Sequence, residues 1–169
     1  MQKLWVVMVG GYPDKAHTEV HDIRFVVGET IEDTFGALKE QWWGGTDRLH
    51  LDAWGALEWA DGHRIVVSDE RPEGAVDASL WFCHLGGYRD GFFGELHSEV
   101  FVVAADKGEA KRKALAMAPR WDSPHRDTQH TVETEVDVEA SLGGPKIWLI
   151  PSKDEIAFSY EAKYYPMRS

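Results

Sequence analysis

The chain contains one stretch of sequence twice. Residues 4–27 read LWVVMVGGYPDKAHTEVHDIRFVV, and residues 80–103 read LWFCHLGGYRDGFFGELHSEVFVV. The two stretches align without a gap at an offset of 76 residues, and 11 of the 24 aligned positions are identical. Chance would give about one or two identities, so the pattern indicates a tandem duplication. This feature limits the fold more than any other, because each copy should form an equivalent unit.

The identical positions are concentrated in a predicted loop. Six of the 11 pairs are glycine or polar residues between two β-rich runs: Gly10/Gly86, Gly11/Gly87, Tyr12/Tyr88, Asp14/Asp90, Glu19/Glu95 and His21/His97. Folding alone would more readily tolerate drift at such positions. The loop is therefore the first candidate for a functional site.

The first copy has the pattern of a ββαββ unit. Residues 4–9 and 23–28 are β-rich, and a helix is expected to start at Thr30, whose spacing to Asp33 resembles a capping box. Residues 49–59 alternate as a half-buried strand, which places His50, Asp52 and Trp54 on its polar face. Asp61-Gly62 then predicts a hairpin turn into residues 64–68.

The second copy repeats this order. Strands are expected at 80–85, 99–105, 132–138 and 147–150, with a helix after residue 106. We therefore predict an α+β fold: a tandem duplication of a ββαββ unit with mostly antiparallel or mixed sheets, one helix per repeat and pseudo-twofold symmetry. The expected divisions are repeat 1 at 1–68, a linker at 69–79, repeat 2 at 80–150 and a tail at 151–169, which adds an extra strand. Both repeats should form one globular unit, and the sequence leaves the sheet topology between them open.

Composition excludes some classes of partner. The net charge is −11, from 29 acidic and 18 basic residues, which disfavours nucleic acid and anionic membranes. Cys83 is the single cysteine, so no internal disulfide can form. The sequence has no run of about 20 apolar residues, the length of a membrane span. We expect a soluble, cytoplasmic protein.

The chain resembles a known family. The loops at Gly10–His21 and Gly86–His97, each with GGY followed by E-x-H, are similar to the bacterial domain-of-unknown-function family 1543 (DUF1543), as are the strand–helix order and the LHLDAW segment at 49–54. The resemblance implies two tandem copies of that domain and a bacterial, intracellular setting. It implies no activity and assigns no catalytic residue. His130 is not a clear equivalent of His50 in the second copy. It falls on the same face as the apolar residues of its predicted strand, whereas His50 falls on the polar face.

The E-x-H pairs carry the strongest chemical signal. In extended backbone, residues i and i+2 point to the same side, so Glu19 can approach His21 and Glu95 can approach His97. Two such pairs facing each other would supply ligands for a divalent transition metal, or an acid/base pair around a small ligand. The alternative is that each pair only ties down its loop.

The remaining candidates have simpler structural explanations. His50 and Asp52 would line a ligand pocket, but a solvated strand face is favoured. The paired glycines predict a tight turn or bulge, and Tyr12 and Tyr88 are expected to cover the core with their rings. Cys83 is expected to be a buried, inert thiol.

Three hypotheses for the function follow. The first is a small-ligand-binding protein whose site is formed by the duplicated loops, with Tyr12, Glu19, His21, Tyr88, Glu95, His97, His50 and Asp52 as candidate residues. The second is a metal-dependent enzyme whose ligands are Glu19, His21, Glu95 and His97. The third is a structural or protein-interaction module, including a homodimer formed through Trp43 or the tail tyrosines.

Overall fold

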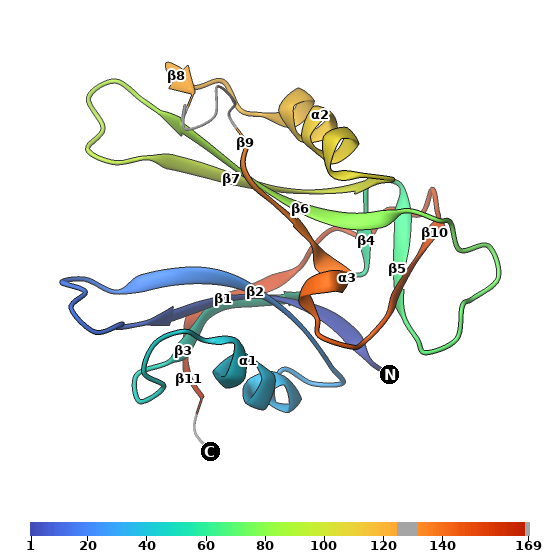
Figure 1. Cartoon of the computed structure of the whole chain (residues 1–169), viewed down its shortest axis with the longest axis horizontal. Coiled ribbons are helices and arrows are strands. Elements are labelled where there is room, and N and C mark those ends of the chain that lie inside the picture. The colour runs from blue at the N-terminus through green and yellow to red at the C-terminus, as the bar shows by residue number, and fades with distance from the viewer. Residues whose placement is uncertain (125–131, 168–169) are drawn as a thin grey trace.

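The computed structural model describes residues 1–124 and 132–167. The fold is α+β with mostly antiparallel sheets, as expected. Two larger sheets lie one above the other, each with a helix on its outer side, and a small third sheet closes one end (Figure 1). The opposite end is open, because the long hairpins of the two sheets do not meet there (Figure 1).

The first large sheet is built around the first copy of the duplicated stretch. Its strand order is β11-β3-β1-β2, and every pairing is antiparallel. The strands are β1 (Lys3–Gly11), β2 (Val20–Gly28), β3 (His50–Ala56) and β11 (Tyr160–Pro166). The tail therefore adds an extra strand to this sheet, as predicted.

The second large sheet is built around the second copy. β6 (Ser79–Tyr88) pairs with β7 (Leu96–Ala104) on one side, and with β9 (Val132–Asp137) and the short β8 (Ser123–Pro124) on the other. The pairing of β1 with β3 shifts register between Met8 and Val9, and that of β6 with β9 shifts between His84 and Leu85. These two irregularities lie 76 positions apart, at the same offset as the sequence repeat.

The third sheet combines the last strands of both predicted units. Its order is β10-β5-β4, with β4 (Trp59–Ala60), β5 (His63–Val67) and β10 (Ile147–Pro151). The final strand of each predicted unit thus lies outside the two large sheets, and these two strands, β5 and β10, pair with each other. The predicted turn between β4 and β5 is confirmed, since Asp61 and Gly62 both have positive φ, at 45° and 78°.

The predicted capping box at Thr30 forms, and α2 also begins with a side-chain cap. Thr30 N donates to Asp33 Oδ2 at 2.9 Å, ahead of a 3-10 turn (Glu32–Thr34) and helix α1 (Phe35–Gln41). Asp106 caps α2 (Lys107–Met117) by accepting a hydrogen bond from Glu109 N, also at 2.9 Å. A short helix α3 (Val138–Ser141) follows β9, so Val138 is helical rather than the end of a strand.

Three apolar clusters hold these layers together. One lies between the large sheets and reaches the third sheet, with Leu4, Phe25, Phe82 and Leu149 among its members. The second fills the space between the first sheet and α1, and the third lies under α2. Burial of apolar surface at about 25 cal/mol per Å² makes these clusters the main stabilising contribution.

The structure corrects the prediction for residues 49–59. The register shift in β3 breaks the alternation, so Leu51 and Trp54 both pack into the cluster under α1. Trp54 was predicted on the polar face and is only 6% exposed. His50, for which a solvated face was favoured, is 3% exposed. A bulge inserts one residue into a strand and reverses the parity beyond it, which simple alternation does not reveal.

Among the described residues, no helix is long and apolar enough to cross a membrane.

Candidate functional site

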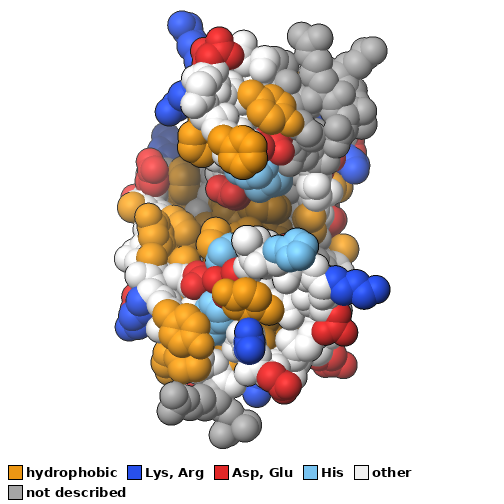
Figure 2. Space-filling model, turned by 90° about the vertical axis from the view of Figure 1, so that its left-hand side faces the viewer, with side chains coloured by type: hydrophobic (Ala, Val, Ile, Leu, Met, Phe, Trp, Pro, Cys, Tyr) orange, Lys and Arg blue, Asp and Glu red, His pale blue; other side chains and the backbone are white. Residues whose placement is uncertain are grey.

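A cavity of about 650 Å³ lies between the two large sheets, and we call it the intersheet cleft. Volumes between about 300 and 1,000 Å³ are typical of small-molecule sites. Figure 2 looks into the open end of the molecule and shows histidine and acidic side chains on both halves beside the hollow between them. The cleft is lined by Met8, His21, Asp22, Ile23, Arg24, Phe25, Gln41, Phe82, His84, His97, Glu99, Thr134, Val136 and Ser141.

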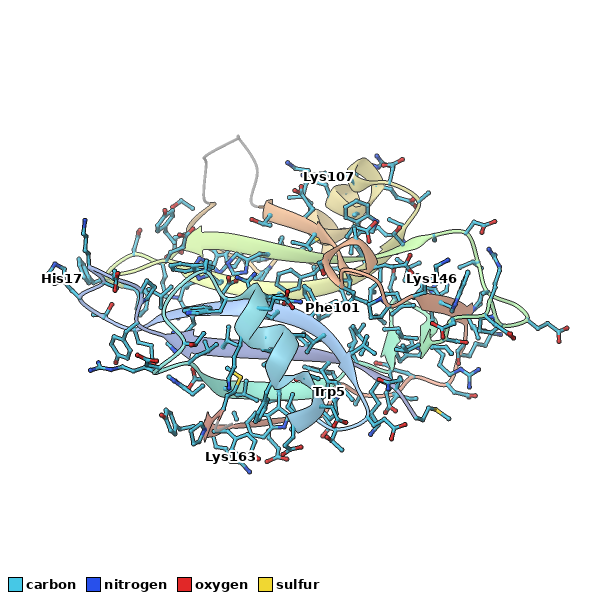
Figure 3. All side chains as sticks on the ribbon, turned by 60° about the horizontal axis from the view of Figure 1, so that its bottom comes forward. Trp5, His17, Phe101, Lys107, Lys146 and Lys163 are labelled. Atoms are coloured by element: carbon cyan, nitrogen blue, oxygen red, sulfur yellow. The ribbon has the colours of Figure 1, made fainter. Side chains whose placement is uncertain are left out.

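The floor of the intersheet cleft is aromatic. Phe25 and Phe82 line the cleft and contact each other edge-on, with ring centroids 5.3 Å apart. Phe101 is not one of the lining residues, but it packs against both rings at 6.1 and 5.5 Å. Figure 3 shows Phe101 in the middle of the molecule, between the sheets. Such edge-to-face packing gives a rigid apolar surface.

His21, on one wall of the cleft, belongs to a group of side chains gathered around Gly10. In β1, Gly10 lies directly between His21 of β2 and His50 of β3. A Cβ atom at this position would collide with Asp52 Oδ2 and would lie 2.7 Å from His50 Nε2. Gly10 is therefore the residue that lets side chains from both neighbouring strands meet above the central one.

Four side chains meet above Gly10 in a closed ring of contacts, which we call the first His–carboxylate cluster (Glu19, His21, His50 and Asp52). Glu19 lies 3.0 Å from His50 Nε2 and 3.6 Å from His21 Nε2. Asp52 Oδ2 lies 3.4 Å from His50 Nε2 and 3.2 Å from His21 Nε2. Each imidazole thus faces two carboxylates.

Backbone and aromatic contacts fix the orientation of His50. Its Nδ1 lies 2.8 Å from the carbonyl oxygen of Arg48, so Nδ1 carries the proton and donates it. Nε2 is therefore the nitrogen directed at Glu19 and Asp52. The ring of Tyr164, from β11, covers the imidazole at a centroid distance of 4.4 Å.

The opposite wall carries a second His–carboxylate cluster (His84, Glu95, His97 and Glu99). His97 Nε2 lies 3.5 Å from Glu95, and His84 Nδ1 lies 3.4 Å from Glu99. The two imidazoles stack on each other at 4.5 Å. The hydrogen bond from His84 holds the pKa of Glu99 below its usual range, so this carboxyl is ionised at neutral pH.

The second glycine of each GGY motif has a packing role. A Cβ atom at Gly11 would lie 2.8 Å from the ring of Trp42, and one at Gly87 would collide with Trp121. The tyrosines that follow do not cover the core as predicted, since Tyr12 is 43% exposed and Tyr88 is 39% exposed.

The structure brings the predicted site residues together only in part. His21 and His97 line the same cleft, and Glu19 and Glu95 contact them from either side. Within residues 1–124 and 132–167, no group of three or more His, Cys, Asp or Glu side chains is arranged to hold a metal ion. The metal-ligand set Glu19, His21, Glu95 and His97 stays a prediction. His130 lies outside the described residues.

Sequence reasoning missed His84 and Glu99, the two members of the second His–carboxylate cluster that line the cleft beside His97. Both sit on the cleft face of their strands, two positions from Phe82 and Phe101 respectively. Strand parity was the available signal, but identity between the two copies does not reveal them, because their counterparts are Met8 and Ile23. The buried state expected for Cys83 is confirmed, and burial raises the pKa of its thiol to about 11.

Comparisons with known proteins support the fold and match part of the chain to one family, without supplying an activity. A crystal structure of a protein, Il1583 from Idiomarina loihiensis, matches this chain with a TM-score of 0.74 and 28% identity over 99% of both chains. No curated protein matches the sequence. Residues 16–67, which include Glu19, His21, His50 and Asp52, match the family model described as Domain of Unknown Function (DUF1543), and over this range the chain is therefore similar to that family.

Proposed function

We propose that the protein binds a small organic ligand in the intersheet cleft. The observation that carries the proposal is that His21 and His97, the duplicated histidines, line one cavity from opposite sheets. The volume of about 650 Å³ suits a small molecule. An apolar floor with polar groups on two walls is the usual composition of such sites, because burial supplies affinity and the polar groups fix orientation.

The construction of the walls supports a binding role over simple loop support. Gly10 is kept free of a side chain so that His50 and Asp52 can reach His21. Glu19 and Glu95 hold the two histidines, and the histidine side chains remain accessible, at 46% for His21 and 39% for His97. A residue that only tied down its loop would not need to line a shared cavity.

A fragment screen tests the proposal with a matched pair of variants. Thr134 is exposed on β9 and lines the cleft, so Thr134→Trp places a bulky side chain at the cavity without replacing a buried residue. Thr46→Trp places the same side chain at an exposed position outside the cleft lining. We expect saturation-transfer NMR to find fragments that bind the wild type and Thr46→Trp but lose binding to Thr134→Trp.

Binding that survives in folded Thr134→Trp would place the ligand elsewhere and contradict the proposal. The absence of any fragment whose binding depends on Thr134 would contradict it as well. Circular dichroism of both variants shows whether the fold is intact.

One observation favours the metal-dependent enzyme as a second candidate. Asp52 Oδ2 is buried and accepts no hydrogen bond within the described part of the chain, although two imidazole nitrogens lie within 3.4 Å of it. A divalent cation recruited by Glu19, His21 and their neighbours would compensate its charge. Elemental mass spectrometry of untagged protein, beside a His21→Ala/His97→Ala variant, tests this candidate. A stoichiometric metal that disappears in the variant supports it, and wild-type protein without metal after exposure to Zn²⁺ and Mn²⁺ contradicts it.

We also propose that the two large sheets descend from one duplicated unit. Trp5 Nε1 donates to Gly28 O, and Trp81 Nε1 donates to Ala104 O. The donors and the acceptors of these two hydrogen bonds are both 76 residues apart, which is the offset of the sequence repeat. The matching register shifts in β1 and β6 give further support. Deletion of residues 1–68 removes β5 and leaves β10 without its partner strand. We expect the remaining chain not to fold alone, and independent folding would favour self-sufficient ββαββ units instead.

A further inference from the structure

The outer strand of the first large sheet carries exposed aromatic side chains. β11 is the end strand of the order β11-β3-β1-β2, so among the described strands it pairs with β3 alone. Figure 3 shows Lys163 of this strand at the rim of the molecule. Tyr160 and Tyr164 are 63% and 66% exposed, and the exposed ring of Phe158, just before the strand, lies 5.8 Å from that of Tyr160. A strand edge of this kind is a ready template for pairing with another strand.

The sequence of β11 is complementary to itself in the antiparallel direction. Residues 160–164 read YEAKY, with Ala162 at the centre. If two copies of the strand run antiparallel about a twofold axis at Ala162, Tyr160 lies opposite Tyr164 of the second copy. Glu161 then lies opposite Lys163 of the second copy. A twofold contact of this kind requires one patch to match itself, and this pattern meets the requirement.

Both faces of the paired strands would be matched. Neighbouring residues of a strand point to opposite faces, so Glu161 and Lys163 share one face and the two tyrosines share the other. Glu161 Oε2 accepts a hydrogen bond from Lys163 Nζ within the chain, and both side chains remain 59% exposed. In the pair of strands, the four charges alternate in sign around the axis. Opposite charges and aromatic rings that lie directly across antiparallel strands stabilise the pairing.

One feature of β11 limits the length of this pairing. The register of the β11–β3 pair shifts between Ala162 and Tyr165, so Lys163 lies in a bulge. Bulges and lysines at a sheet edge normally oppose association between strands. Here the charge of Lys163 is matched by Glu161 of the second copy, whereas the bulge confines regular pairing to the residues around Ala162. The contact is therefore small, and we expect a reversible dimer with a micromolar dissociation constant.

We propose that the protein forms a symmetric dimer in which β11 pairs antiparallel with β11 of a second copy about Ala162. The first large sheets of the two copies then continue into each other. This inference is independent of the ligand of the intersheet cleft, because the residues that carry it do not line that cavity.

Analytical ultracentrifugation of the full chain from low to high micromolar concentration tests the dimer. Glu161→Lys and Lys163→Glu each place like charges opposite each other across the axis, so each should weaken dimerisation at least about tenfold. The double variant Glu161→Lys/Lys163→Glu restores opposite charges and should recover the dimer. Glu73→Lys is the matched control, since it changes the net charge as Glu161→Lys does at an exposed position outside β11, and it should have no effect.

A cysteine at the axis tests the register. Residues directly opposite each other in antiparallel strands have Cα atoms about 4.5–5.5 Å apart, which is within the range of a disulfide. Ala162→Cys should therefore give a covalent dimer when an oxidant is added, whereas Glu73→Cys should not. The native Cys83 is buried and does not compete for this reaction. Circular dichroism of every variant shows whether the fold is intact.

Each contrary outcome overturns the proposal. Wild-type protein that stays monomeric at all these concentrations excludes the dimer. A dimer that persists in both single charge variants, or that the double variant does not recover, places the contact on another surface, such as the exposed Phe92 and Phe93 of the β6–β7 hairpin. Cross-linking of folded Ala162→Cys that is no faster than that of Glu73→Cys excludes the axis at Ala162.

Discussion

At the residue scale, Gly10 explains why the motif begins with a glycine. Its missing side chain leaves the space in which Asp52 and His50 approach His21. The sequence shows that Gly10 and Gly86 are identical, but it does not show why a glycine is needed at Gly10. That reason depends on β3, whose side chains reach Gly10 across 40 residues of chain.

Gly10→Ala should open the first His–carboxylate cluster. The added Cβ collides with Asp52 and His50, and overpacking of this kind costs roughly 1–3 kcal/mol. Urea denaturation measures the loss. Gly36→Ala is the matched control, because a Cβ there meets nothing within 4 Å and α1 gains a better helix former. Equal stability of the two variants would contradict the packing role of Gly10.

The Glu99–His84 contact predicts a pH dependence. The pKa of Glu99 is lowered in the folded protein, so the contact stabilises the fold above the unfolded value of about 4.3 and loses this effect as the pH falls through the lowered pKa. Glu99→Gln should therefore reduce the free energy of unfolding at pH 7 by only about 0.2–1 kcal/mol, since the group is partly exposed.

The difference between Glu99→Gln and the wild type should narrow as the pH falls from about 4.3, where the unfolded carboxyl becomes protonated, through the lowered pKa of the native carboxyl. Denaturation curves at pH 7 and pH 3 measure it. A difference that grows as the pH falls would contradict the sign of the shift.

At the element scale, local signals predicted the strands of the duplicated stretch and the starts of both helices. β1, β2, β6 and β7 follow apolar runs, and Thr30 and Asp106 begin the predicted helical segments. The pairing of β5 with β10 was not predictable, because it joins segments about 80 residues apart and no local pattern selects the partner. The bulge in β3 was missed for a related reason, since only pairing with β1 defines it.

The turn between β4 and β5 anchors the third sheet to the second. Asp61 Oδ2 accepts hydrogen bonds from Val103 N and Lys113 Nζ, both at 2.8 Å. Asp61→Ala should cost roughly 1–3 kcal/mol, because it leaves the Val103 amide without this acceptor and places alanine at a positive φ of 45°.

Asp61→Asn separates the contributions at this turn. Asparagine tolerates the positive φ and keeps an acceptor for Val103, but it removes the charge opposite Lys113, so we expect a smaller loss than for alanine. Asp69→Ala, at an exposed position, should have little effect. Thermal unfolding of the three variants measures the order of their stabilities. A loss of stability in Asp69→Ala equal to that in Asp61→Ala would contradict the anchoring role.

At the scale of the whole molecule, the shared third sheet should make the halves unfold together. β5 comes from the first half and β10 from the second, and one apolar cluster contains residues of both. We expect a single cooperative transition in urea. Hydrogen exchange of β3 and β9 amides should report the same global free energy, whereas two transitions or two separate free energies would indicate independent halves.

The candidate site was predicted at the level of its duplicated residues and not at the level of its shape. Glu19, His21, Glu95 and His97 were found because they recur, while the cleft exists because the two sheets face each other with Phe25, Phe82 and Phe101 between them. The relative placement of the two sheets is a property of the assembled layers. No alternation or spacing within a single copy encodes it.

The most direct test of the account is whether one ligand touches both walls of the intersheet cleft. The measurement is an NMR titration of the histidine imidazoles with a fragment that depends on Thr134, with His21→Gln and His97→Gln used for assignment. The account predicts that the His21 and His97 resonances shift with the same dissociation constant, while His17 at the tip of the β1–β2 hairpin (Figure 3) and His63 in β5 stay unchanged. Shifts confined to one wall, or to His17 and His63, would contradict it.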